Sequence, residues 1–170
     1  MSDHTLLDGK KILIVDDEAD VLEILEELLE MCDVVKASTF EDAKNLLESQ
    51  PFDMAILDIM GVDGYGLLEI ANKKGIPAVM LTAHAFTPGN LLRSIKEGAD
   101  SYLPKEEMVN IATFLNDVLE AIEKGKSPWG PWQKKLPTSY FERRWGAAWQ
   151  DTDKDFWEKF RAGIKDRKNK

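Results

Sequence analysis

A regular alternation between short apolar runs and longer amphipathic segments, from Lys11 to Lys124, constrains the fold of this chain more than any other feature. Short runs rich in Ile, Val, Leu and Met predict strands, and the third and fourth runs are apolar enough for burial on both faces. The five predicted strands are KILIV (11–15), VVKA (34–37), DMAILD (53–58), IPAVMLT (76–82) and SYLP (101–104).

The segments between and after these runs carry apolar residues at helical spacing. In the first segment Val21, Leu22 and Leu25 fall on one face, and glutamates line the opposite face. The fourth helix is predicted to begin with Thr87 as its cap and Pro88 in its first turn. The five predicted helices cover about 19–31, 40–48, 65–73, 88–98 and 107–124.

Strands and helices in alternation predict an α/β fold, a doubly wound five-stranded parallel sheet with helices on both faces and right-handed crossovers. The 170 residues, 44% of them apolar, suffice for one such domain and an appendage. In a sheet of this kind the ligand site lies beyond the carboxyl ends of the strands, near the point where strand order reverses. Functional side chains are therefore expected at these ends.

Charged and hydroxyl side chains follow the predicted strands at that edge. Asp16 and Asp17 follow the first strand, Asp58 ends the third, Thr82 ends the fourth, and Lys105 follows the fifth. Each of them alone has an ordinary alternative role, such as capping a helix for the two adjacent aspartates. Their common register makes a single site the better interpretation.

Three carboxylates in one partly buried site repel each other, so either their pKa values rise or a cation lies among them. Oxygen ligands without His or Cys favour a hard ion, and a small site completed by water favours Mg²⁺. A divalent ion beside a lysine and a threonine suits a phosphoryl group carried by one of the carboxylates. The pattern thus predicts Mg²⁺-dependent phosphoryl chemistry.

Four segments of the sequence resemble the signature segments of the receiver domain of two-component response regulators. They are ILIVDDEADV, DMAILDIM, VMLTAH and GADSYLPK, and the resemblance extends over residues 10–124. It implies a flavodoxin-like strand order, 2-1-3-4-5. It also implies that Asp58 accepts a phosphoryl group from a phosphohistidine, with slow self-dephosphorylation rather than conventional turnover.

The resemblance implies a role for each residue of the metal site. Asp17 and Asp58 would bind Mg²⁺ directly, together with the backbone carbonyl of Met60, and Asp16 would act mainly through water.

The resemblance also implies which side chains bind the phosphoryl group and respond to it. Lys105 would pair with the phosphoryl oxygens, and Thr82 and Tyr102 would form a coupled switch pair in which the hydroxyl moves toward the phosphoryl group and the ring turns inward. The implied partners are a sensor histidine kinase or phosphotransfer protein, a downstream protein target and a second copy in a homodimer.

The sequence departs from the family pattern at two places. The loop in DIMGVDGYG, between Asp58 and the Asp-Gly that precedes the third helix, is shorter than usual. Lys105 is followed by Glu106, where the family has a proline in the cis form. A cis bond before a residue other than proline costs about 3 kcal/mol, so we expect a trans bond and a shifted loop.

The charge distribution divides the chain after Lys124. Residues 1–124 carry 25 acidic and 10 basic side chains, whereas residues 125–170 carry 6 acidic and 12 basic ones and all five tryptophans. A composition shift of this kind marks a candidate boundary. We predict a disordered tail (1–9), a receiver domain (10–124), and a Gly/Pro/Trp linker with a two-helix extension (125–170), the helices covering about 138–150 and 153–168.

The aromatic faces of the predicted extension need a partner surface, because two short helices bury little area alone. Three interpretations stay open: folding back onto the acidic domain, a dimer interface or docking element for another protein, and binding to nucleic acid or an anionic membrane. No recognition-helix pattern is visible, so DNA binding is not expected.

The chain is expected to be cytoplasmic. No apolar stretch approaches the roughly 20 residues of a membrane span, and the N-terminal MSDHTLLDGKK has no features of a secretory signal peptide. The single cysteine, Cys32, excludes an internal disulfide and is expected to pack as a small apolar residue.

Two further function classes remain beside the phosphoacceptor switch. A receiver-like binding or scaffold module would take no phosphate and would use the Trp-rich extension constitutively. A phosphatase with an aspartate nucleophile would carry Asp-x-Asp after its first strand, where this chain has DDE. The complete set of five site residues favours the switch.

Overall fold

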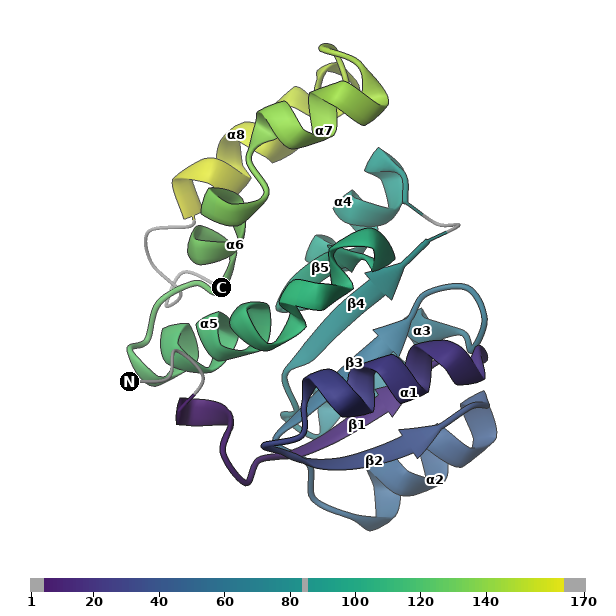
Figure 1. Ribbon diagram of the computed structural model, residues 1–170. Helices are drawn as coiled ribbons and strands as arrows, with labels where there is room; N and C mark the ends of the chain where they lie inside the picture. The colour runs from purple at the N-terminus through teal and green to yellow at the C-terminus, as the bar shows by residue number, and fades with distance from the viewer. Residues whose placement is uncertain (1–4, 84–85, 164–170) are drawn as a thin grey trace.

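Five parallel strands form one sheet in the order β2-β1-β3-β4-β5, as predicted (Figure 1). The structure is a computed structural model that describes residues 5–83 and 86–163. β3 and β4 are buried along their whole length, as expected for central strands with helices on both faces. The strands are β1 (Lys11–Val15), β2 (Asp33–Ala37), β3 (Met54–Asp58), β4 (Ala78–Thr82) and β5 (Ser101–Pro104).

Five α-helices flank the sheet, with α1 and α5 on one face and α2, α3 and α4 on the other (Figure 1). The predicted cap of α4 is present: Thr87 Oγ1 accepts the Asn90 N–H at 3.1 Å, and Pro88 occupies the first turn. The helices are α1 (Ala19–Leu28), α2 (Phe40–Ser49), α3 (Gly64–Lys73), α4 (Pro88–Lys96) and α5 (Ile111–Glu123).

Two predicted helix boundaries differ from the structure. α1 ends at Leu28 rather than near residue 31. The helix expected over 107–124 is divided, because Lys105–Asn110 form a 3₁₀-helix and α5 begins only at Ile111. Regular apolar spacing also begins at Ile111, whereas Val109 is largely exposed, so only the later segment has a continuous face to bury.

Part of the N-terminal segment is ordered, although residues 1–9 were expected to be a disordered tail. Thr5–Leu7 form a 3₁₀-helix next to α5, and the Leu7 side chain is completely buried. The Cys32 thiol donates to the Leu7 carbonyl at 3.3 Å, and burial raises its pKa to about 11. Cys32 is partly buried and packs against the core as a small apolar residue, as expected.

The C-terminal extension contains three helices instead of the predicted two. They are α6 (Trp129–Lys135), α7 (Thr138–Trp145) and α8 (Lys154–Gly163), the last preceded by a 3₁₀-turn at Asp151–Asp153. Pro128 and Pro131 suggested a linker, but they lie before and within the first turn of α6, where no intrahelical hydrogen bond needs their missing N–H.

The helix expected over 138–150 ends early. Gly146 adopts φ of 87°, which terminates α7, so Ala148 is exposed rather than part of the buried face. Residues 164–168, the end of the other predicted helix, lie outside the described part of the chain.

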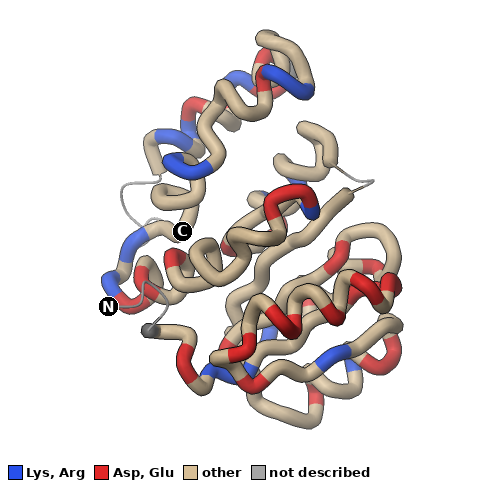
Figure 2. Tube along the Cα trace, in the orientation of Figure 1, with Lys and Arg blue, Asp and Glu red and all other residues tan. Residues whose placement is uncertain are grey.

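The extension folds back onto the α/β domain, the first of the three interpretations left open. α6 packs against α5, and tryptophans of the extension donate hydrogen bonds to main-chain carbonyls of the domain. Acidic residues are dense on α1 and α2, and basic residues recur along the extension (Figure 2). None of the helices in the described residues is long and apolar enough to cross a membrane.

Candidate functional site

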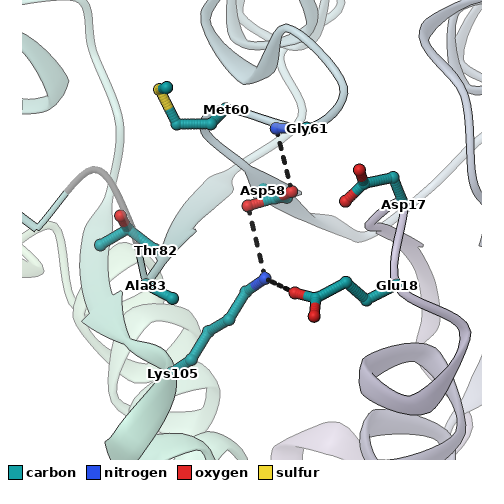
Figure 3. Close-up of a pocket in the computed structure, with 8 residues that line it drawn as sticks. All are labelled: Asp17, Glu18, Asp58, Met60, Gly61, Thr82, Ala83 and Lys105. Carbon is teal, nitrogen blue, oxygen red and sulfur yellow. Dashed lines mark hydrogen bonds and ion pairs between the residues drawn. The ribbon is translucent and has the colours of Figure 1, made fainter.

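The parallel sheet brings the predicted residues together at one edge. β1 ends directly before Asp16, Asp58 closes β3, Thr82 closes β4, and Lys105 follows β5. They meet at a pocket of about 330 Å³ beyond the carboxyl ends of the strands (Figure 3). Its lining residues are Asp17, Glu18, Asp58, Met60, Gly61, Thr82, Ala83 and Lys105.

Lys105 is the cation at the centre of this site. Its Nζ lies 2.8 Å from Glu18 Oε1 and 3.6 Å from Asp58 Oδ1 (Figure 3). It also lies 2.9 Å from Asp16 Oδ2. Burial lowers the pKa of Lys105, but the interactions with Glu18 and Asp16 outweigh it and raise the pKa above its ordinary value. The lysine is therefore a permanent positive charge.

Asp58 is almost completely buried, and its two oxygens have different surroundings. Oδ1 faces Lys105, whereas Oδ2 accepts the Gly61 N–H at 3.2 Å (Figure 3). Burial and the charge of Asp16 raise the pKa of Asp58 to about 6, against the opposing effect of Lys105. One lysine thus does not compensate for the clustered negative charge.

Asp16 is the most deeply buried member of the site, with no exposed surface. Its Oδ1 accepts the Glu18 N–H at 2.9 Å, and its Oδ2 pairs with Lys105. Burial raises its pKa, and these two interactions oppose the shift. Asp16 therefore holds Lys105 in position without itself lining the pocket.

The acidic oxygens converge as a cation site requires. Carboxylate oxygens of Asp16, Asp17 and Glu18 lie within 4.8 Å of one another. A Cβ added to Gly61 would overlap Asp17 Oδ1 and lie 2.6 Å from Asp58 Oδ2, so these two oxygens approach the same point beside the Gly61 main chain. All of these donors are hard oxygen ligands, and the residues present therefore fit a Mg²⁺ ion.

The short loop after Asp58 presents an N–H group, not a carbonyl, to the acceptor residue. The N–H and C=O of one trans peptide point in opposite directions, so the Met60 carbonyl is turned away from Asp58 Oδ2 in this conformation. The Met60 side chain is 66% exposed and also points away from the carboxylates (Figure 3). This arrangement differs from the ligand role expected for Met60.

The predicted switch pair occupies neighbouring strands on one face of the sheet. Met80 pairs with Tyr102 and Thr82 with Pro104, so Thr82 and Tyr102 are diagonal neighbours. The Thr82 hydroxyl is buried without a hydrogen-bond partner among the described residues. The Tyr102 ring is completely buried, and its hydroxyl approaches the Thr87 carbonyl at 3.5 Å.

Sequence reasoning missed three residues that line the pocket: Glu18, Gly61 and Ala83. The signal for Glu18 was its position directly after the aspartate pair, and that for Gly61 was the short loop that forces the chain past Asp58. The Lys105–Glu106 bond is trans, as expected from the missing proline.

The sequence matches the family model for the response regulator receiver domain over residues 12–116. It is 43% identical over 116 residues to the probable transcriptional regulator ycf27 of Guillardia theta, a match covering 62% of this chain and 45% of the relative. It is 35% identical over 115 residues to the two-component response regulator ARR10 of Arabidopsis thaliana, covering 61% of this chain and 20% of the relative. The chain thus spans about half or less of these curated relatives.

Solved structures align with about two thirds of the chain, the extent of its α/β domain. A two-component response regulator from Clostridium difficile aligns with a TM-score of 0.61 and 25% identity, covering 67% of this chain and 98% of that one. A CheY-like response regulator receiver domain protein from Methanospirillum hungatei aligns with a TM-score of 0.56 and 32% identity, covering 68% and 92%. The family-model match ends before α6, so α6, α7 and α8 lie outside it.

The raised pKa of Asp58 predicts a pH-dependent penalty in the metal-free protein. Folding favours the protonated form of Asp58. The contribution of Asp58 to the free energy of unfolding is therefore most favourable below pH 4, and this advantage is lost as the pH rises through 6. At about 1.4 kcal/mol per pKa unit, Asp58→Asn should exceed the wild type in free energy of unfolding by on the order of 3 kcal/mol at pH 7.5. The difference should vanish near pH 4.

Urea unfolding in EDTA at several pH values measures this difference, and Glu23→Gln on the exposed face of α1 is the control for simple charge removal. A wild type more stable than Asp58→Asn at pH 7.5, or a difference independent of pH, would contradict the expected burial penalty.

The close approach of Gly61 to two carboxylates predicts that Gly61→Ala weakens Mg²⁺ binding. The new methyl group would occupy the space between Asp17 Oδ1 and Asp58 Oδ2, so we expect a loss of affinity of at least about 10-fold. Gly89→Ala is the matched control, because the nearest atom to its added Cβ is 3.9 Å away. Calorimetric Mg²⁺ titration measures the affinity of each variant. Equal Mg²⁺ affinities of Gly61→Ala and Gly89→Ala would argue against an ion between Asp17 and Asp58.

Proposed function

The chain belongs to the response regulator receiver domain family, and from this membership we propose that it is a phosphorylation-dependent signalling switch. Asp58 accepts the phosphoryl group of a phosphohistidine on a sensor histidine kinase or phosphotransfer protein, with Mg²⁺, and the modified domain changes a protein–protein contact. The observation that carries the proposal is the position of Asp58 Oδ1 at 3.6 Å from Lys105 Nζ in the pocket lined by Thr82 and Asp17.

The different surroundings of the two Asp58 oxygens suggest different roles in phosphoryl transfer. Oδ1, the oxygen nearer Lys105, is the nucleophile: it forms the O–P bond as the P–N bond of the phosphohistidine breaks and the imidazole retains the bonding electron pair. Oδ2 stays on the side of the Gly61 N–H and Asp17. Attack from Oδ1 would bring the phosphoryl oxygens toward the lysine ammonium group, which neutralises part of their charge.

Glu18 and Asp16 hold Lys105 before the transfer. Both carboxylates contact its Nζ more closely than Asp58 does. Glu18 is about half exposed, so its interaction with the lysine is screened by solvent and easily exchanged for one with phosphoryl oxygens. Asp16 is buried and keeps the lysine directed at the site.

Asp17 and Asp58 would hold the Mg²⁺ ion directly, and Asp16 would act through water. When bound, the ion neutralises the carboxylates and stabilises charge on the phosphoryl oxygens. The Met60 carbonyl would join the coordination sphere only after the Met60–Gly61 peptide turns over, since its N–H now points to Asp58 Oδ2.

Thr82 and Tyr102 would transmit the modification. The buried Thr82 hydroxyl needs a hydrogen-bond partner, and a phosphoryl oxygen on Asp58 supplies one. Movement of this hydroxyl toward the site leaves room that the inward ring of its diagonal neighbour, Tyr102, occupies. The output is a contact on the face around β5.

A phosphodonor experiment tests the phosphoacceptor function. With Mg²⁺ and phosphoramidate, the protein should gain about 80 Da by intact mass, and the adduct should be absent in Asp58→Asn. Lys105→Met should form it on the order of 100-fold more slowly, because the phosphoryl charge loses its cation. Asp53→Asn, which removes an exposed carboxylate away from the pocket, should react as the wild type does.

A phosphorylated histidine phosphotransfer protein serves as the second donor. Absence of an adduct with both donors, or an adduct that persists in Asp58→Asn, would contradict the proposal and favour a binding module that acts without phosphate.

A further inference from the structure

The C-terminal helices lie directly on the strand that carries Tyr102. In α6, the Trp132 indole N–H donates to the Tyr102 carbonyl at 2.7 Å, and the Trp129 indole N–H donates to the Ala99 carbonyl at 3.2 Å. Both tryptophans are buried. The extension therefore satisfies main-chain acceptors of β5 and of the turn before it, instead of touching the domain through apolar contact alone.

Phe86 links the Tyr102 ring to the C-terminal helices. It lies in the segment between β4 and α4, and its ring stacks on Tyr102 with centroids 6.1 Å apart and an interplanar angle of 20°. Its other neighbours belong to α7, with ring centroids 4.8 Å away for Trp145 and 6.0 Å away for Phe141. The Trp145 indole N–H also donates to the Phe86 carbonyl at 3.2 Å.

A polar contact ties the extension to the residue after Lys105. The guanidinium of Arg144, in α7, binds the Glu106 carboxylate through two hydrogen bonds of 2.7 and 3.1 Å, and it stacks 3.9 Å over the Tyr140 ring. Figure 1 shows α6, α7 and α8 as a layer along α5 and β5. The extension thus contacts the segments that follow both Thr82 and Lys105.

We propose that helices α6, α7 and α8 are the internal partner of the switch. Their closed position and phosphorylation of Asp58 favour each other: phosphorylation tightens the packing of these helices on β5, and the packed helices slow the loss of the phosphoryl group. This inference rests on the phosphoacceptor function proposed above. It identifies the segment 129–163 as the part of the chain whose packing responds to phosphorylation of Asp58.

The sign of the coupling comes from the position of Tyr102. With the extension closed, the ring is completely buried and covered by Phe86, which Trp145 supports. Turning the ring outward would require displacement of this aromatic layer. The closed extension therefore holds the inward ring position that phosphorylation also favours, and two events that favour one conformation stabilise each other reciprocally.

The test compares Trp132→Phe with Trp157→Phe. The first removes the hydrogen bond to Tyr102 and keeps an aromatic ring. Among the described residues, the aromatic neighbours of Trp157 all belong to the extension: Trp149, Phe156 and Phe160. Arg144→Gln is a second test variant at a partly exposed position, where folding is not at risk. Intact mass after donor removal gives the lifetime of the adduct in each protein.

We expect Trp132→Phe and Arg144→Gln to lose the phosphoryl group faster than the wild type, by about five-fold for the lost indole hydrogen bond, and Trp157→Phe to match the wild type. In the wild type, hydrogen exchange of the Trp132 and Trp145 indole N–H groups, measured by NMR, should slow on phosphorylation. Equal lifetimes in all four proteins, or indole exchange unaffected by a formed adduct, would overturn this inference alone. Absence of any adduct would instead remove the phosphoacceptor function and the inference with it.

Discussion

The ion pairs of Lys105 with three carboxylates are the interaction on which the rest of the site depends. A buried carboxylate is costly unless a cation and hydrogen bonds accompany it, and Asp16 and Asp58 are both buried. Lys105 reaches them from the end of the strand at the sheet's edge, so the parallel arrangement of β1, β3 and β5 is what makes the ion pairs geometrically available. The raised pKa of Asp58 shows that one lysine leaves part of the charge uncompensated. This deficit makes the same pocket receptive to a second cation.

The meeting of the site residues was predictable because it follows from where apolar runs end, whereas the strand order was implied only by the resemblance to receiver domains. Asp58 and Thr82 end predicted strands, and Asp16 and Lys105 directly follow them. Parallel pairing places such ends at one edge whatever the details of packing. The direction of the Met60–Gly61 peptide was not predictable in this way. It depends on how a short loop closes, which the pattern of apolar residues does not encode.

The extension shows a different limit of sequence reasoning. Aromatic residues at helical spacing correctly indicated buried faces on α7 and α8, but α6 was missed because its Gly and Pro residues have low helix propensity. Its stability comes from tertiary contacts: Trp129 and Trp132 are buried, and they donate hydrogen bonds to the carbonyl groups of Ala99, before β5, and of Tyr102, within it. Phe86 could not be identified as a contact residue either, because its neighbours in α7 are more than 50 positions away in the sequence.

Glu106 connects the site to the extension at the position where the family has a proline. The Lys105–Glu106 peptide is trans, Lys105 pairs with Asp16, and the Glu106 side chain binds Arg144 in α7. The interaction with Arg144 lowers the pKa of Glu106, yet a partly exposed ion pair contributes little stability. Its two parallel hydrogen bonds instead fix geometry. The buried aromatic residues therefore supply most of the free energy that holds the extension, and the Glu106–Arg144 pair sets the register in which α7 lies beside the phosphoryl-binding lysine.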